Sequence, residues 1–172
     1  MITVDSVIGN INADERLNEE YQTLSKNGLC EKIVISRMES QRVRMRKTTD
    51  KGTDVGLILP QGTVLRNGDI IHMARDKMIV IELEPENVAV LSLRSDEEDH
   101  DLFAVAVKIG HALGNLHRPI QVSGEKIYVP IQAESEIELL SKIFEPLHDH
   151  LEISKTKIVF EPEEGIRTHE HT

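Results

Sequence analysis

The first part of the chain contains short apolar-rich segments with period-two patterns, and these segments restrict the fold more than any other feature. The segments are Ile33–Ile35, Arg42–Arg46, Val55–Leu59 and Ile70–Met73. They are separated by the turn-forming sequences Lys51-Gly52, Pro60-Gln61-Gly62 and Asn67-Gly68-Asp69. A period of two is typical of strands with one buried face, and Gly, Pro and Asn-Gly mark the turns between them. We therefore predict a small, mostly antiparallel β domain over residues 1–76, of the type that binds a partner or a peptide.

Three arginines lie on one face of one of these predicted strands. Arg42, Arg44 and Arg46 alternate with Val43 and Met45, so the guanidinium groups share a face of the strand. One interpretation is a solvated face balanced by nearby carboxylates. The other is a surface for docking an acidic partner protein.

A different order of elements is expected from Lys77 onward. A buried strand over 88–93 precedes a helix that the Ser95-Asp96-Glu97-Glu98 capping box would begin. The apolar face of this helix is Leu102, Val105, Ala106, Ile109 and Leu113.

The second half of this region repeats the alternation of strands and helix. The segments 119–122 and 126–129 read as a hairpin. A second capping box, Ser135–Glu138, would begin a helix that Pro146 ends, and residues 151–160 supply the closing strand. The order βαββαβ predicts a ferredoxin-like domain over 77–160, for metal binding and dimerisation, within an α+β fold. The polar segment 161–172 is expected to be a disordered tail.

Composition and charge exclude several classes of function. The formal net charge of −10 disfavours a nucleic-acid partner, because phosphate binding needs a concentrated basic surface. Aromatic residues are only 3% with no Trp, so the core must be aliphatic. Cys30 is the single cysteine, which leaves no internal disulfide and no thiolate cluster. Neither a signal peptide nor a membrane-length apolar run is evident, and we expect a soluble, cytoplasmic protein without membrane contact.

A helix stop followed at once by a histidine marks residues 110–119. Gly114 and Asn115 are expected to end the helix, which places His117 on a turn where unpaired carbonyls and the helix dipole favour a cation. One imidazole holds a metal weakly, but two copies related by a two-fold axis supply two ligands and leave positions open. A turn histidine bonded to a carbonyl explains the spacing equally well.

The same stretch carries a family resemblance. Its pattern, Gly-His-x-Leu-Gly-Asn-x-His-x-Pro, resembles the motif of the UreE urease accessory protein family, the nickel metallochaperones. Other segments that resemble the family, in the same order along the chain, are Arg42–Thr48, Gly52–Leu57, Thr63–Asp69 and Phe160–Gly165.

The resemblance implies a function and partners. His117 would bind Ni(II), as cargo for delivery during urease maturation, at a site shared by the two protomers of a homodimer; Zn(II) or Cu(II) are alternatives in vitro. The implied partners are the urease accessory GTPase and, through it, the apo-urease assembly complex, and the protein itself would not be an enzyme. Histidine-rich tails occur in the family, so His169 and His171 are candidate additional ligands. The alternative for this pair is a polar tail without a role.

The remaining histidines give weaker signals. His111 lies six residues before His117 on the expected helix, so the two side chains do not share a face, and we interpret it as structural. His148 and His150 have a His-x-His spacing but fall in an expected exposed loop. His72 and His100 are interpreted as structural.

Two functions from other classes remain as alternatives. One is a protein-interaction module of the urease assembly complex, in which the β domain is the working part and no metal is bound directly. The other is a metal-dependent hydrolase with His111 and His117 as ligands, disfavoured because the sequence shows no base placed to activate a metal-bound water.

Overall fold

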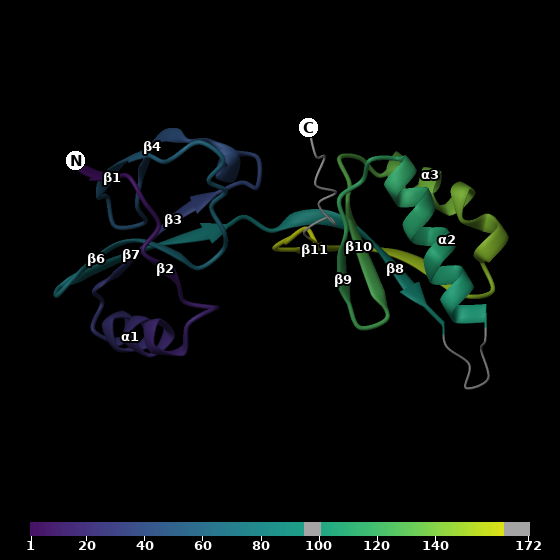
Figure 1. The fold of residues 1–172 in the computed structure, drawn as a ribbon, viewed down its shortest axis with the longest axis horizontal. Coiled ribbons are helices and arrows are strands. Elements are labelled where there is room, and N and C mark those ends of the chain that lie inside the picture. Colours follow the sequence, from purple (N-terminus) through teal and green to yellow (C-terminus); the bar gives the residue numbers. More distant parts are fainter. Residues whose placement is uncertain (95–100, 164–172) are drawn as a thin grey trace, which may run out of the picture. The chain divides into compact units, whose positions relative to one another are not determined.

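The computed structural model describes residues 1–94 and 101–163 of the 172-residue chain (Figure 1). The chain divides into two compact units, Met1–Glu84 and Pro85–Thr172. The predicted capping box at Ser95–Glu98 and the tail histidines His169 and His171 lie outside the described residues.

The N-terminal unit contains two sheets. Three strands form the first sheet in the order β1 (Ile2–Val4), β5 (Asp54–Ile58) and β4 (Arg44–Thr48). Four strands form the second in the order β2 (Gly9–Asn10), β6 (Asp69–Ala74), β7 (Lys77–Leu83) and β3 (Cys30–Ile35). The pairs β1–β5 and β3–β7 are parallel and the others antiparallel. The predicted β domain is therefore present, with more parallel pairing than the alternating pattern indicated.

The helix α1 (Glu15–Lys26) was not predicted. Its N-cap, Asp14, accepts hydrogen bonds from the backbone N–H groups of Arg16 (2.9 Å) and Leu17 (3.3 Å). The helix places three partly buried residues, Leu17, Tyr21 and Leu24, against a cluster of buried residues on the second sheet. Their spacing of four and three residues is helical, but so short an apolar face is easily overlooked in a polar segment.

The boundary between the units lies later than the expected one after residue 76. Strand β7 was expected to lead into the second domain, yet it pairs with β3 and β6 of the N-terminal sheet. Its central residues, Met78–Ile81, are 0–4% exposed. Removing β7 would expose this apolar surface, so the N-terminal unit continues to Glu84.

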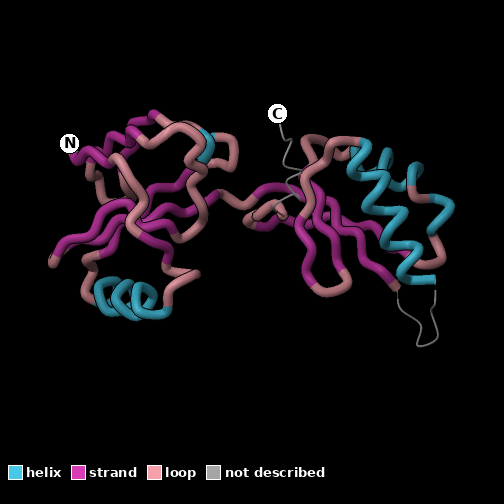
Figure 2. Tube along the Cα trace, viewed as in Figure 1, coloured by secondary structure: helices cyan, strands magenta, loops and turns pink. Residues whose placement is uncertain are grey.

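The C-terminal unit has the predicted ferredoxin-like architecture. Its elements in chain order are β8 (Glu86–Leu93), α2 (Asp101–Asn115), β9 (Gln121–Ser123), β10 (Lys126–Pro130), α3 (Ser135–Ile143) and β11 (Leu151–Ile158). The sheet order is β11-β8-β10-β9, and every neighbouring pair is antiparallel. Helices α2 and α3 lie together beside the sheet (Figure 2).

An aliphatic core joins α2 and α3 to the sheet. Val105, Ile109 and Leu113 are the buried residues of α2, as the predicted apolar face requires. They pack in one cluster with buried residues of α3 and of strands β8 and β10. This packing fixes the axis of α2 and therefore the place where the helix ends.

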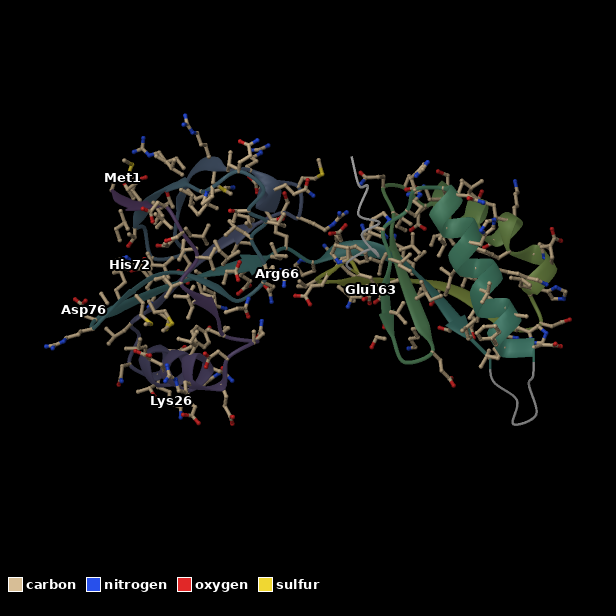
Figure 3. All side chains as sticks on the ribbon, in the orientation of Figure 1. Met1, Lys26, Arg66, His72, Asp76 and Glu163 are labelled. Carbon is tan, nitrogen blue, oxygen red and sulfur yellow. The ribbon has the colours of Figure 1, made fainter. Side chains whose placement is uncertain are left out.

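The start of the predicted tail is held against the edge strand β9. The N–H of Glu163 donates to the carbonyl of Ile120 (2.7 Å), and the Glu163 carboxylate accepts from the N–H of Val122 (2.9 Å). Glu163 is labelled in Figure 3. Residues 161–163 thus belong to the folded unit, contrary to the expectation of disorder from Glu161 onward, because they cover backbone groups that an edge strand leaves open.

Carboxylates partly balance the predicted arginine row, in which Arg44 and Arg46 lie on β4 and Arg42 precedes the strand. Arg46 binds Asp54 through two hydrogen bonds (2.8 and 2.9 Å), and Arg42 lies 4.0 Å from Glu39. The Arg46 guanidinium lowers the pKa of the Asp54 carboxyl. These pairs fit the interpretation of a solvated face.

The described helices are too short or too polar to cross a membrane.

A buried carboxylate connects the two sheets of the N-terminal unit. Glu31 on β3 is 6% exposed and accepts hydrogen bonds from Thr49 Oγ1 (2.6 Å) and Lys77 Nζ (2.7 Å). Lys77 Nζ also donates to Thr53 Oγ1 (2.9 Å), and both threonines lie in or near the β4–β5 turn. Burial acts to raise the pKa of Glu31, but the hydrogen bonds from Lys77, Thr49 and Thr53 outweigh it and lower the pKa to about 2.

This lowered pKa predicts an acid-dependent loss of stability in the N-terminal unit. The stabilisation is complete above the ordinary value of 4.5 and is lost as the pH falls through about 2. Glu31→Gln is expected to lower the free energy of unfolding by about 3 kcal/mol at pH 7. The difference from the parent should shrink towards pH 2, as measured by urea unfolding followed through NMR signals of this unit. An equal difference at pH 7 and pH 2 would contradict the assignment.

Candidate metal centre

His117 lies on the turn that ends helix α2. The N–H of His117 donates to the carbonyl of Gly114 (3.0 Å), and the N–H of Arg118 donates to the carbonyl of Leu113 (3.1 Å). These two bonds form a Schellman motif, in which the residue after the C-cap takes a left-handed conformation. The helix itself ends at Asn115, as the sequence predicted.

His117 has a left-handed backbone conformation, which is uncommon for a residue other than glycine. Its φ is +52°, and among the described residues every other positive φ belongs to a glycine. A residue with a Cβ in this conformation costs about 1 kcal/mol relative to glycine, which usually occupies this position. Such local strain is a feature of functional sites. The strain therefore favours a functional role for the imidazole.

The imidazole of His117 is available to a ligand. The residue is exposed, and within the described segments no group hydrogen-bonds to its ring. The carbonyl end of the α2 dipole favours a positive charge nearby. A neutral imidazole is a good ligand for nickel, zinc and copper.

One protomer does not supply a complete ligand set in its described part. Residues 1–94 and 101–163 contain no group of three or more His, Cys, Asp or Glu side chains placed to hold a metal ion. Cys30 is buried in the N-terminal unit, and burial raises the pKa of its thiol. If His117 binds a metal, its other ligands would come from a second copy, from residues outside the described segments or from solvent.

Among the described residues, the histidines do not form a cluster of three or more potential ligands. The ring of His111 forms a hydrogen bond with the Asn115 side chain (3.1 Å) on the same helix. His148 contacts the Glu145 carbonyl (2.9 Å) and the Asp149 carboxylate (3.0 Å). His72 lies on β6 in the other unit. Of the three predicted metal ligands, only His117 lies within the described residues.

An exposed apolar stripe on α2 leads to His117, and it was not predicted. Phe103 is 80% exposed and Val107 is 54% exposed. Gly110 and Gly114 continue the stripe at helical spacing, and a Cβ added at either glycine would meet no atom within 4 Å. The helix interior thus contains two glycines that packing within the protomer does not require, although each lowers helix propensity. The signal was present in the sequence as Phe, Val, Gly and Gly at spacings of four, three and four.

The residue after His117 is anchored by helix α3. The Arg118 guanidinium pairs with the carboxylate of Glu136 and lies 3.4 Å from the carbonyl of Pro130. Glu136 also accepts the N–H groups of Gln132 and Ala133. The predicted capping box at Ser135–Glu138 is therefore wrong, since the N-cap makes no side-chain hydrogen bond and Glu136 binds the preceding backbone instead.

The strain at His117 gives a stability prediction. His117→Gly is expected to be about 1 kcal/mol more stable than His117→Ala, because glycine adopts the left-handed conformation without steric cost. Urea unfolding of the two variants measures the difference directly. Leu116→Gly and Leu116→Ala are the control pair, since Leu116 has no positive φ and alanine should be the more stable there. Equal stability of the two His117 variants would show that the turn is not strained.

Two family models together match almost the entire chain. Residues 4–84 match the N-terminal domain of the UreE urease accessory protein. Residues 86–172 match the C-terminal domain of the same protein. The division between the matches coincides with the boundary between the two compact units.

Individual relatives agree with the family models. A urease accessory protein UreE from Natronomonas pharaonis is 35% identical over 134 residues, which are 78% of this chain and 61% of that protein. A UreE from Yersinia intermedia is 28% identical over 135 residues, 76% of this chain and 58% of its own.

A shorter relative is matched almost in full. Urease accessory protein UreE 1 from Pseudomonas syringae pv. tomato is 26% identical over 149 residues, 87% of this chain and 96% of its own. The chain thus spans about three fifths of the length of the Natronomonas and Yersinia relatives and nearly all of the Pseudomonas one. With both domains matched in order, this chain belongs to the UreE urease accessory protein family.

Proposed function

We propose that this chain is a cytoplasmic nickel metallochaperone that delivers Ni(II) for the maturation of urease. The observation that carries the proposal is His117, an exposed imidazole held in a strained turn at the end of an apolar stripe. Membership in a family of urease accessory proteins supports the biological context. Nickel is cargo in this account, and the protein catalyses no reaction.

The stripe on α2 supports a homodimer with His117 near the two-fold axis. Exposed Phe103 and Val107 offer apolar area, and Gly110 and Gly114 leave room for the backbone of a second helix to approach closely. A two-fold interface uses the same patch on both copies. Because the stripe runs along α2 towards His117, pairing the stripes would bring two imidazoles to one ion.

A shared site of this kind suits transfer of the metal. Two imidazoles and exchangeable positions bind Ni(II) without enclosing it, in contrast to a closed four-ligand cage. His169 and His171 are proposed as additional ligands that adjust capacity or affinity. Nickel binding should weaken in acid, because protons compete for the imidazole nitrogens. Zn(II) and Cu(II) suit the same donors and are expected competitors in vitro.

The proposed partners follow from the same context. The nickel-loaded dimer would deliver its ion to the urease accessory GTPase and, through it, to the apo-urease assembly complex. An exchangeable site is what such a relay needs, since each recipient must be able to displace the donor's ligands.

A nickel titration tests the proposal. The full chain is expected to bind one Ni(II) tightly per dimer at neutral pH, and His117→Ala should abolish this tight binding without unfolding the protein, because an exposed turn residue contributes little to the core. Isothermal calorimetry on samples of known oligomeric state measures both affinity and stoichiometry. His148→Ala is the matched control, since His148 is also exposed and lies outside the proposed site.

Two further results distinguish the contribution of His117 from that of the tail histidines. Deletion of residues 168–172 should lower capacity or affinity while the first site remains, and complete loss would make the tail the main ligand. Tight one-per-dimer binding that survives in His117→Ala would place the site elsewhere and contradict the proposal.

Dimerisation through the stripe gives a second test. Gly110→Leu should weaken the metal-free dimer at least ten-fold, because the new side chain fills the space that a partner helix needs. The same change raises helix propensity by about 1 kcal/mol, so the protomer should stay folded. Lys108→Leu, at an exposed position on another side of α2, is the control. Analytical ultracentrifugation without metal is the measurement, and an unchanged dimer in Gly110→Leu would exclude this interface.

A further inference from the structure

We infer that Glu136 is a positioning residue for the metal centre, acting through Arg118 to hold the His117 turn in its ligand-presenting conformation. This inference rests on the proposed function, since it concerns the same site. Glu136 does not approach the metal itself. Its contribution is to prevent the chain after His117 from relaxing.

Both oxygens of the Glu136 carboxylate are engaged. One oxygen pairs with the Arg118 guanidinium. The other accepts the backbone N–H groups of Gln132 and Ala133, the latter at 3.1 Å. The Glu136 and Arg118 side chains are 17% and 28% exposed, so the pair is shielded more than an ordinary surface salt bridge. Its geometry is fixed at both ends, which is the condition for an ion pair to orient a neighbouring segment.

The groups around Glu136 favour its charged form, which is the form that pairs with Arg118. The N–H of Gln132 lowers the pKa of Glu136 most, burial partly opposes this, and the charge and hydrogen bond of Arg118 lower the pKa further. The pair is therefore present above the ordinary carboxyl range and is lost only as the pH falls through the lowered value.

Arg118 transmits the constraint to His117. Its backbone N–H is bonded to Leu113 at the end of α2, while its guanidinium reaches Glu136 on α3 and the Pro130 carbonyl at the end of β10. The residue directly after His117 is thus fastened to two helices and one strand. A histidine would leave a φ of +52° if the flanking chain allowed it. The fastening of Arg118 keeps the unfavourable conformation populated.

A nearby ion pair of the same chemistry provides a matched control. Glu134 pairs with Lys155 of β11, only two residues from Glu136 along the chain. The Glu134 side chain is 72% exposed, and its partner Lys155 belongs to β11 and not to the His117 turn. A general effect of removing a carboxylate near the start of α3 would appear equally in Glu134→Gln and Glu136→Gln.

The test is a nickel titration of the 172-residue chain carrying Glu136→Gln, at known oligomeric state. The glutamine retains an oxygen for the Gln132 and Ala133 N–H groups but loses the charge that pairs with Arg118. Nickel affinity is expected to fall about ten-fold, a typical effect of losing a group that orients a ligand. Glu134→Gln should bind nickel as the parent does. Parent affinity in Glu136→Gln, with a normal dimer, would overturn the inference.

A metal-free readout separates positioning from stability. The NMR order parameter of the His117 amide should fall in Glu136→Gln towards values typical of flexible backbone and stay unchanged in Glu134→Gln. If Glu136→Gln does not fold, Arg118→Met removes the same pair from the other side and should give the same two changes. A rigid His117 amide in a folded variant lacking the pair would also overturn the inference.

The nickel affinity of His117→Ala distinguishes a failure of the proposed function from a failure of the positioning role of Glu136. In that background Glu136→Gln should have no further effect on residual nickel binding, as a double-mutant cycle requires for residues that act at one site. If His117→Ala itself retains tight binding, the proposed function fails. If His117→Ala loses binding but Glu136→Gln retains it, only the positioning role fails.

Discussion

The backbone conformation of His117 is the constraint on which the candidate metal centre depends. A histidine replaces the usual glycine in the left-handed position of a Schellman motif, at a cost of about 1 kcal/mol. The aliphatic packing of α2 against the sheet fixes where the helix ends, and the backbone bonds to Leu113 and Gly114 then set the turn. The result is an imidazole that projects to solvent from a rigid element. A site on such an element loses little entropy when it binds an ion.

The proposed function rests on His117, and the apolar stripe of α2 supports its sharing between two protomers. The described residues of one protomer contain no group of three potential ligands. One exposed imidazole among them does not enclose a metal ion by itself. The apolar stripe of α2 offers a way to double the ligand by symmetry. In the proposed dimer, binding strength would depend on dimer geometry and on added ligands, and open coordination positions would permit release of the ion. A nickel metallochaperone needs both a sufficient binding strength and a route for releasing the ion.

Patterns that repeat over many residues were predictable from the sequence, and contacts between distant residues were not. The βαββαβ order and the buried face of α2 follow from hydrophobic periodicity. Strand β7 was assigned to the wrong side of the boundary, because its partners β3 and β6 are known only once the sheet is formed. Helix α1 was missed because its apolar face is short. The turn at His117 was predicted from Gly114 and Asn115, whereas its left-handed conformation and the Arg118–Glu136 anchor depend on tertiary structure.

The most direct test of a shared nickel site is the metal stoichiometry of a mixed dimer. One protomer would carry His117 and the other His117→Ala, and the mixed species would be isolated with two different affinity tags before nickel is added. A shared site predicts that the mixed dimer loses tight binding, as the doubly substituted dimer does, because only one of the two imidazoles remains. Retention of half a nickel or more per mixed dimer, at the parent affinity, would show that each protomer holds the ion alone and would contradict the account.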